Sequence, residues 1–206
     1  MAMIEELLRE PTLVKTYYNS VSIALILTAW EELAKEGKKV CVVNLEKMPW
    51  EHIINRPKAE PSCEEGSEVL VYNAERPQEV PLKFRLVTSF KRVIEDVRYG
   101  VVEKVEGNLF RLLLGDEIYL FRVINERVVE EGLPKVGQSI VQVLQEYGGS
   151  LPMKDLVLIV SGKTRASREE VRQNLALLKN VGLLEIEGGI VSLNKYSGLK
   201  GHGNLL

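Results

Sequence analysis

A chain of 206 residues with 45% hydrophobic and 27% charged residues has the composition of a globular protein, and it contains no apolar run long enough to span a membrane. Its net charge of −2 is unevenly divided, because residues 133–206 hold nine Lys and Arg against six Asp and Glu, whereas residues 1–132 hold 18 against 23. The length allows two domains with separate cores, and the basic one is the better candidate for nucleic-acid binding.

The N-terminal segment and the rare residue types indicate the cellular location and the cofactors. Residues 1–10 are acidic and lack the basic flank and apolar core of a secretory signal, so we expect a cytoplasmic protein. Cys41 and Cys63 do not make a disulfide framework, and with only His52 and His202 beside them they offer no zinc-ligand spacing. We therefore expect neither a metal nor another cofactor. The heavy use of Lys, Glu and Arg is typical of a thermophile.

The first residues predict a short helix followed by a strand, a helix and a second strand. Pro11 ends the short helix because proline cannot continue its hydrogen-bond ladder, and residues 12–17 follow as a short strand. From Ser20, apolar residues recur at helical spacing until Gly37 ends the helix. Residues 38–46 then contain the continuous apolar run of a buried parallel strand.

The next segments complete an α/β domain over residues 1–132. Three prolines make residues 47–67 an irregular connection, and residues 68–75 predict another buried strand. Residues 84–100 fit either a strand and a helix or two short elements. Residues 101–132 alternate in polarity and turn at two Gly-containing dipeptides, so we expect an antiparallel β-meander of two or three strands.

One stretch of this domain has the element order of a nucleotide-binding strand, loop and helix but lacks the glycines of a phosphate-binding loop. If residues 12–14 form the strand, residues 15–22, KTYYNSVS, occupy the eight positions of a phosphate loop. Lys15 and Ser20 then stand where the two glycines belong. Val21 replaces the lysine, and Ser22 alone keeps the expected residue type.

With the helix and strand that follow over residues 23–46, this stretch resembles a degenerate RecA-like P-loop ATPase domain, and a weaker similarity extends to about residue 130. The resemblance implies a reduced RecA-like sheet; a generic βαβ unit is the alternative. The loop lysine and glycines are missing, and between Tyr72 and Tyr99 no apolar strand ends in the Asp that such ATPases need for magnesium and water, so we expect no triphosphate binding. Glu46 stands where these families often place a catalytic acid, but without a bound triphosphate it would have nothing to activate. Two histidines also allow no catalytic triad, so we expect no enzyme.

The last third of the chain predicts three helices followed by a hairpin. The three helices cover residues 137–148, 152–161 and 167–182. The apolar face of the first helix consists of Ile140, Val143, Leu144 and Tyr147. Ser167 is the N-cap of the third helix, Glu170 is its capping-box partner, and Gly182 ends it. Residues 183–193 then form a compact hairpin around a Gly-Gly turn.

This order over residues 135–194 resembles the winged helix-turn-helix family. The resemblance implies an α+β winged-helix domain over residues 133–195, with a flexible tail over residues 196–206. It also implies that the third helix enters the major groove of DNA and that its first half and the preceding turn contact the DNA. In such contacts, Arg binds guanine or phosphate and Gln binds adenine. The implied DNA-binding residues are Lys163, Thr164, Arg165, Ser167, Arg168, Arg172 and Gln173.

The spacing of the arginines supports DNA contact, whereas the nearby acidic residues weaken it. Arg165, Arg168 and Arg172 recur at i, i+3 and i+7, on one side of the expected helix and away from its apolar residues. Glu169 and Glu170 dilute the positive charge, and the hairpin tip carries no Lys or Arg. Winged helices of that kind often bind proteins instead.

We expect a non-catalytic DNA-binding accessory or regulatory protein, in DNA repair or transcription regulation, whose ATPase-like domain pairs with a RecA-like ATPase or with a second copy of the chain. The alternatives are a ligand-sensing transcriptional regulator and a winged helix used only for protein–protein interaction. Trp30, Tyr119 and Phe121 are expected in the core, whereas Tyr17 and Tyr18 are candidates for an exposed stacking or partner-binding surface.

Overall fold

The computed structural model describes residues 3–194 and 198–199. Within these residues the chain divides into two compact units, unit 1 with residues 3–115 and 119–131 and unit 2 with the remainder. The tail expected over residues 196–206 lies outside the described residues except for strand β12 (Gly198–Leu199), which pairs in parallel with residues 117–118. Among the described residues, no helix is long and apolar enough to cross a membrane.

Unit 1 is built on a mixed β-sheet whose parallel part has the strand order β5-β1-β4-β3-β2. The four strands that precede β5 are β1 (Thr12–Lys15), β2 (Val40–Val43), β3 (Glu68–Val71) and β4 (Leu86–Ser89). β2 is a continuous apolar run, and β1 and β4 are buried along all or most of their length, as is typical of a parallel sheet covered on both faces. β1 lies in the middle and pairs with both β4 and β5.

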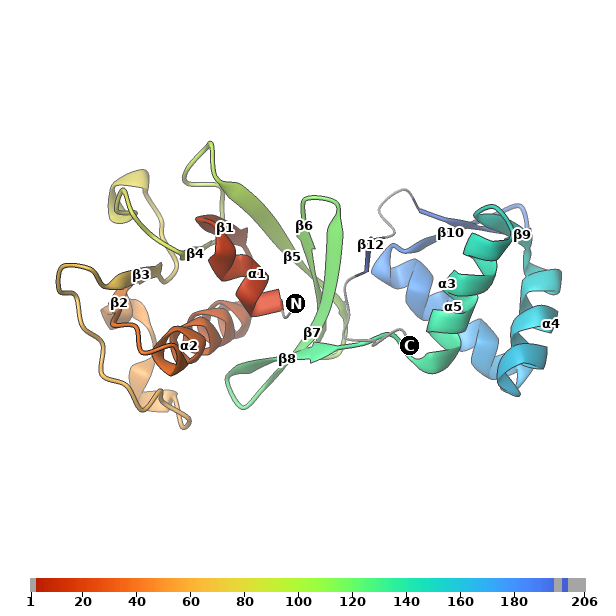
Figure 1. Cartoon of the computed structure of the whole chain (residues 1–206), viewed down its shortest axis with the longest axis horizontal. Coiled ribbons are helices and arrows are strands. Elements are labelled where there is room, and N and C mark those ends of the chain that lie inside the picture. Colours follow the sequence, from red (N-terminus) through yellow and green to blue (C-terminus); the bar gives the residue numbers. More distant parts are fainter. Residues whose placement is uncertain (1–2, 195–197, 200–206) are drawn as a thin grey trace. The chain divides into compact units, whose positions relative to one another are not determined.

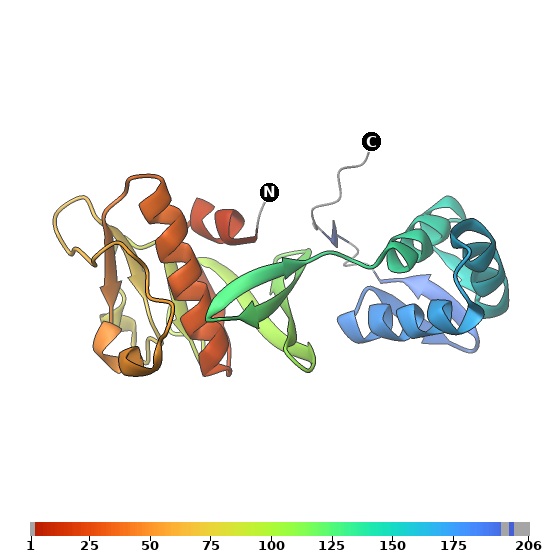
Figure 2. The same cartoon turned by 90° about the horizontal axis from the view of Figure 1, so that it is seen from below.

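Two helices cover one face of this sheet, and loops cover the other (Figures 1 and 2). The helices are α1 (Met3–Arg9) and α2 (Asn19–Lys35), and α2 is buried on most sides. The opposite face is a smaller apolar cluster centred on Leu13 and Val87, closed by the loop residue Val93. Short 3-10 turns interrupt the connections at η1 (Leu45–Lys47), η2 (Trp50–His52) and η3 (Pro77–Glu79).

The antiparallel part of the sheet contains four strands, one or two more than the sequence indicated. They are β5 (Arg98–Glu106), β6 (Leu109–Leu114), β7 (Glu117–Ile124) and β8 (Arg127–Glu131). The missed turn lies at Asn125 and Glu126, which both have positive φ without a glycine. Residues 90–97 form neither helix nor strand, so the undecided segment 84–100 is a strand, a loop and the start of β5.

The three aromatic residues that the sequence analysis assigned to the core lie there, whereas Tyr18, a candidate for an exposed surface, packs against Phe110 at 5.2 Å between ring centroids. Trp30, Tyr119 and Phe121 are buried in the main core, which confirms that prediction. Trp30 also stacks on Trp50 at 6.0 Å between ring centroids, which anchors the irregular connection after β2.

The cysteines correct the sequence analysis, because Cys41 and Cys63 form a disulfide with their Cα atoms 4.5 Å apart. Cys41 lies on β2, an edge strand of the sheet, and Cys63 lies in the irregular connection between β2 and β3. The N–H of Ser62 donates a hydrogen bond to the carbonyl of Val40 at 2.8 Å, so the connection folds back along β2. The disulfide and this segment thereby cover an edge strand that would otherwise present unpaired backbone groups.

Unit 2 contains three helices and a small antiparallel sheet of strand order β10-β11-β9 (Figure 1). In chain order its elements are α3 (Lys135–Glu146), β9 (Ser150–Pro152), α4 (Met153–Thr164), α5 (Arg168–Val181), β10 (Leu184–Glu187) and β11 (Ile190–Leu193). The helices and the hairpin were predicted; β9 was not, because three residues carry no periodicity. Tyr147 follows α3 and is more than half exposed, which corrects its assignment to the apolar face.

Replacing both cysteines, Cys41→Ser with Cys63→Ser, is expected to lower the free energy of unfolding by about 3 kcal/mol, because a cross-link restricts the unfolded chain. The estimate uses the sequence separation of 22 residues between the two cysteines. Urea unfolding of the oxidised wild type and the double variant measures the difference. A dithiol reductant should bring the wild type close to the variant and leave the variant unchanged; equal stabilities without reductant would contradict the expectation.

Candidate functional site

The turn between α4 and α5 uses side chains that the sequence assigned to DNA contact. The Thr164 hydroxyl donates a hydrogen bond to the carbonyl of Val160 at 2.8 Å and accepts one from the N–H of Ala166 at 3.3 Å. Arg165 ends α4 in the left-handed conformation with φ 59°. The turn therefore holds the Thr164 hydroxyl, while the Arg165 side chain is exposed.

Lys163 is paired within unit 2. Its Nζ lies 2.7 Å from Oε2 of Glu146, at the end of α3. This hydrogen bond lowers the pKa of the Glu146 carboxyl. An exposed pair of this kind contributes little to stability, but it compensates part of the charge that Lys163 offers to a phosphate.

The first half of α5 is exposed on one side and buried on the other. The Ser167 hydroxyl accepts a hydrogen bond from the N–H of Glu170 at 3.1 Å, which confirms Ser167 as the N-cap. Arg168, Arg172 and Gln173 are exposed. The buried side consists of Val171, Leu175, Leu178 and Val181. Core packing thus fixes which side chains of α5 face solvent.

Two of the three arginines lie together, and a cation from α4 joins them. Because α5 begins at Arg168, Arg165 is not on the helix, and the three arginines do not form one helical side as predicted. Arg168 and Arg172 line a surface hollow of about 380 Å³ with Lys154 and Asp155 of α4. The sequence analysis missed Lys154, since only the packing of α4 against α5 brings it there.

The hairpin of β10 and β11 is acidic. Glu185 and Glu187 of β10 are exposed, and residues 184–193 include no Lys or Arg. A strand hairpin that follows a phosphate backbone needs positive charge, so the cations of α4 and α5 would provide the favourable electrostatics of any nucleic-acid contact.

In unit 1 three residues connect β1, which ends at Lys15, to α2, which starts at Asn19. Of the positions aligned with a phosphate loop, Lys15 therefore ends the strand, and Ser20, Val21 and Ser22 lie in the first turn of the helix. Val21, at the position of the loop lysine, and Ser22, at the position that holds magnesium in a phosphate loop, are fully buried.

Side chains from neighbouring strands close the space in front of α2. Asn19 Oδ1 accepts hydrogen bonds from the Tyr72 hydroxyl at 2.5 Å and from Asn73 Nδ2 at 2.9 Å. The N–H of Asn73 in turn donates to Thr88 Oγ1 at 3.0 Å. Burial raises the pKa of Tyr72, so its hydroxyl remains a donor at neutral pH. These hydrogen bonds join the first residue of α2 to the residues that follow β3.

A second polar group holds the end of β2 to the connection after β3. Asn44 Nδ2 donates to the carbonyl of Tyr72 at 3.1 Å and to Oε2 of Glu79 at 2.9 Å. The same carboxyl accepts from the N–H of Glu75 and from Lys47 Nζ, both at 3.1 Å. These donors, with the Glu75 N–H first, lower the pKa of Glu79 to about 2.

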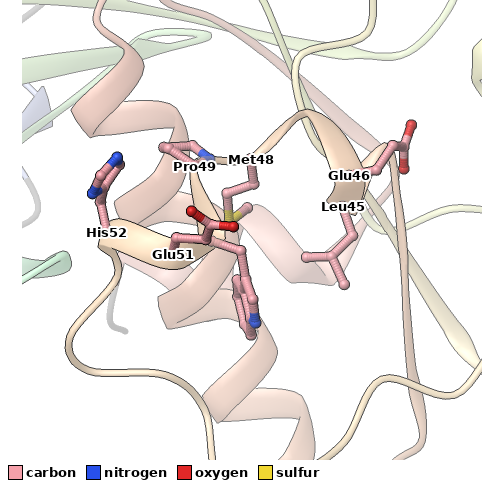
Figure 3. A pocket seen from close by; sticks show the side chains of 7 residues that line it. Leu45, Glu46, Met48, Pro49, Glu51 and His52 are labelled. Carbon is pink, nitrogen blue, oxygen red and sulfur yellow. The ribbon is translucent and has the colours of Figure 1, made fainter.

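An open hollow of about 640 Å³ lies beside η1 and η2 (Figure 3). Leu45 and Met48 are directed into it, and Glu51 lies beside Met48. Trp50 also lines the hollow, which makes it apolar with carboxylates near its rim. Negative charge disfavours a phosphate group, so the hollow does not restore a nucleotide site. Among the described residues, no three His, Cys, Asp or Glu side chains are grouped as metal ligands.

No model of a protein family matches the chain, and no curated protein matches it.

Glu79→Gln is expected to destabilise the protein at neutral pH, and the difference from wild type should disappear at low pH. A carboxyl with a lowered folded-state pKa stabilises the fold fully above its unfolded pKa of about 4.3 and loses this contribution as the pH falls towards 2. Thermal melts of both proteins at pH 7, 4 and 2.5 measure the difference in stability. Glu51→Gln, at an exposed carboxylate of η2, is the matched control. A Glu79→Gln difference that stays constant with pH would contradict the assignment.

Proposed function

We propose that the chain is a non-catalytic DNA-binding accessory or regulatory protein whose unit 2 is a winged helix-turn-helix domain that contacts duplex DNA through α5. The observation that carries the proposal is the exposed pair Arg168 and Arg172 on a helix fixed by core packing on its other side. The order of three helices with β9 and the β10–β11 hairpin supports it. Lys154 adds a third cation beside the pair.

For unit 1 we propose a degenerate RecA-like scaffold that pairs with a protein partner, either a RecA-like ATPase or a second copy of the chain. The middle position of β1, with α2 directly after it, supports this origin. Ligands of open α/β sheets bind outside the carboxyl ends of the strands, and here the hydrogen bonds of Asn19 fill that position. A scaffold without a nucleotide site still offers its surface to a partner.

We propose a cytoplasmic protein of a thermophile. The Cys41–Cys63 disulfide is unusual for a cytoplasmic protein of a mesophile, but intracellular proteins of hyperthermophiles contain disulfides. The charged composition agrees with this source.

A second candidate function is protein binding by unit 2. Leu158 of α4 and Ile190 of β11 are 60% and 50% exposed, and the hairpin beside Ile190 is acidic. The N–H of Met153 donates to the carbonyl of Gly189 at 2.8 Å, so the start of α4 lies against the hairpin. Exposed apolar side chains in such a region favour a protein partner.

Duplex DNA is expected to bind the purified chain in a salt-dependent manner, and Arg168→Ala with Arg172→Ala should weaken the binding. Fluorescence anisotropy with a random duplex at several salt concentrations measures both. If each arginine contacts one phosphate, the slope of log affinity against log salt concentration decreases by about 2, because each phosphate contact contributes about 0.9.

Lys179→Ala, in the last turn of the same helix, is the matched control and should leave the slope unchanged. Absence of duplex binding by the wild type at low salt would reject the DNA proposal and leave protein binding through the region of Leu158 and Ile190.

A further inference from the structure

Cations alternate with aromatic rings on the face of the parallel sheet opposite α2. Lys15 and Leu13 lie two residues apart on β1 and therefore point to the same face. Tyr99 of β5 is the Cα partner of Leu13, and both belong to the apolar cluster of this face. Lys15 and Tyr99 thus project on one side of the sheet, where loops and no helix cover the strands.

Two cation–π contacts join these cations and aromatic rings. Lys15 Nζ lies 5.0 Å from the ring centroid of Tyr17, and Arg92 Cζ lies 4.8 Å from that of Tyr99. A hydrogen bond with Tyr17 raises the pKa of Lys15. Tyr17 is 66% exposed, which leaves much of its ring open to a ligand.

The end of β4 adds a third ring and another cation. The N–H of Thr16 donates to the carbonyl of Ser89 at 2.9 Å, so the chain leaves β1 and β4 at adjacent points. Phe90 follows directly and is 41% exposed. Lys91 comes next and is exposed. Residues that are distant in the sequence therefore converge at one edge of the sheet.

Two of the acidic residues near this edge are paired with arginines, and Asp96 is exposed. Glu95 pairs with Arg92 at 2.9 Å, and Glu103, further along β5, pairs with Arg111. Lys15 and Lys91 have no carboxylate within ion-pairing distance in the part of the chain that the structure describes. Their charge is available to an anionic ligand.

We propose that this edge, defined by Lys15, Tyr17, Phe90, Lys91 and Arg92, binds single-stranded nucleic acid. A base stacks on the open ring of Tyr17, and the phosphates on either side lie next to Lys15 and Lys91. Rings flanked by cations recognise single strands because unpaired bases expose their faces, whereas those of a duplex are covered by neighbouring bases. The site is in unit 1, so it is separate from the proposed duplex contact of α5.

The test measures the affinity of the full-length chain for a fluorescent oligo-dT of about 15 nucleotides, close to the upper site size of a single-strand-binding module. Tyr17→Ala is expected to weaken binding about 5- to 100-fold, the range for loss of one stacked base. Tyr17→Phe keeps the ring and should bind within about twofold of wild type. Lys15→Gln should lower the salt slope by about 0.7, the value for one phosphate of a single strand.

Two controls separate this proposal from the proposed function. Arg168→Ala with Arg172→Ala should weaken duplex binding and leave oligo-dT binding by unit 1 in place. Tyr17→Ala should do the reverse, and because Tyr17 is exposed, its melting temperature should match that of wild type. The proposal is overturned if wild type fails to bind oligo-dT at low salt, if Tyr17→Ala binds it as tightly as wild type, or if Tyr17→Phe loses as much affinity as Tyr17→Ala.

Discussion

The parallel pairing of β1 with both β4 and β5 is the constraint on which unit 1 depends. A four-residue strand held on both sides leaves no room for a slip in register, because such a slip would exchange its two buried faces. It fixes where α2 begins, and it brings the ends of β1 and β4 to one edge. The hydrogen bond from Thr16 to Ser89 continues this pairing beyond the strands, so Tyr17 and Phe90 follow at adjacent points of the two chains.

The strand, loop and helix order at β1 and α2 resembles that of a nucleotide-binding domain, yet the structure has no nucleotide site there. At the carboxyl ends of the strands, the Tyr72 hydroxyl and the Asn73 amide donate hydrogen bonds to Asn19, and the N–H of Asn73 donates to Thr88. A phosphate would have to displace these hydrogen bonds and bury its charge without a lysine to compensate it. The aromatic and basic residues that are free of this network lie nearer the surface, where a larger and more flexible anion has access.

The two proposed nucleic-acid surfaces rely on different physics. In unit 2 the cations of α4 and α5 are held by helix packing, and the acidic hairpin limits the electrostatic contribution to the helices. In unit 1 the cations lie beside aromatic rings, so stacking adds to charge. A protein with both surfaces would contact a duplex and a single strand through separate side chains, which suits an accessory role in repair or transcription regulation.

The sequence by itself determined the elements that have a local signal. Apolar periodicity predicted the helices, apolar runs predicted β2 and β3, and Ser167 and Gly182 marked the ends of α5. These features were predictable because each depends on residues within about two turns of chain. For the candidate sites, the same local reasoning found the arginines of α5 and the exposed Tyr17, but it also named Tyr18 as a surface candidate, although Tyr18 packs against Phe110, and it placed Arg165 on the helix. Only the tertiary structure decided the disulfide, the joining of Lys154 to the arginines, and the placement of the residues after β4 beside the end of β1. These depend on strand order and helix packing, which bring together residues far apart in the chain and leave no periodic trace in the sequence.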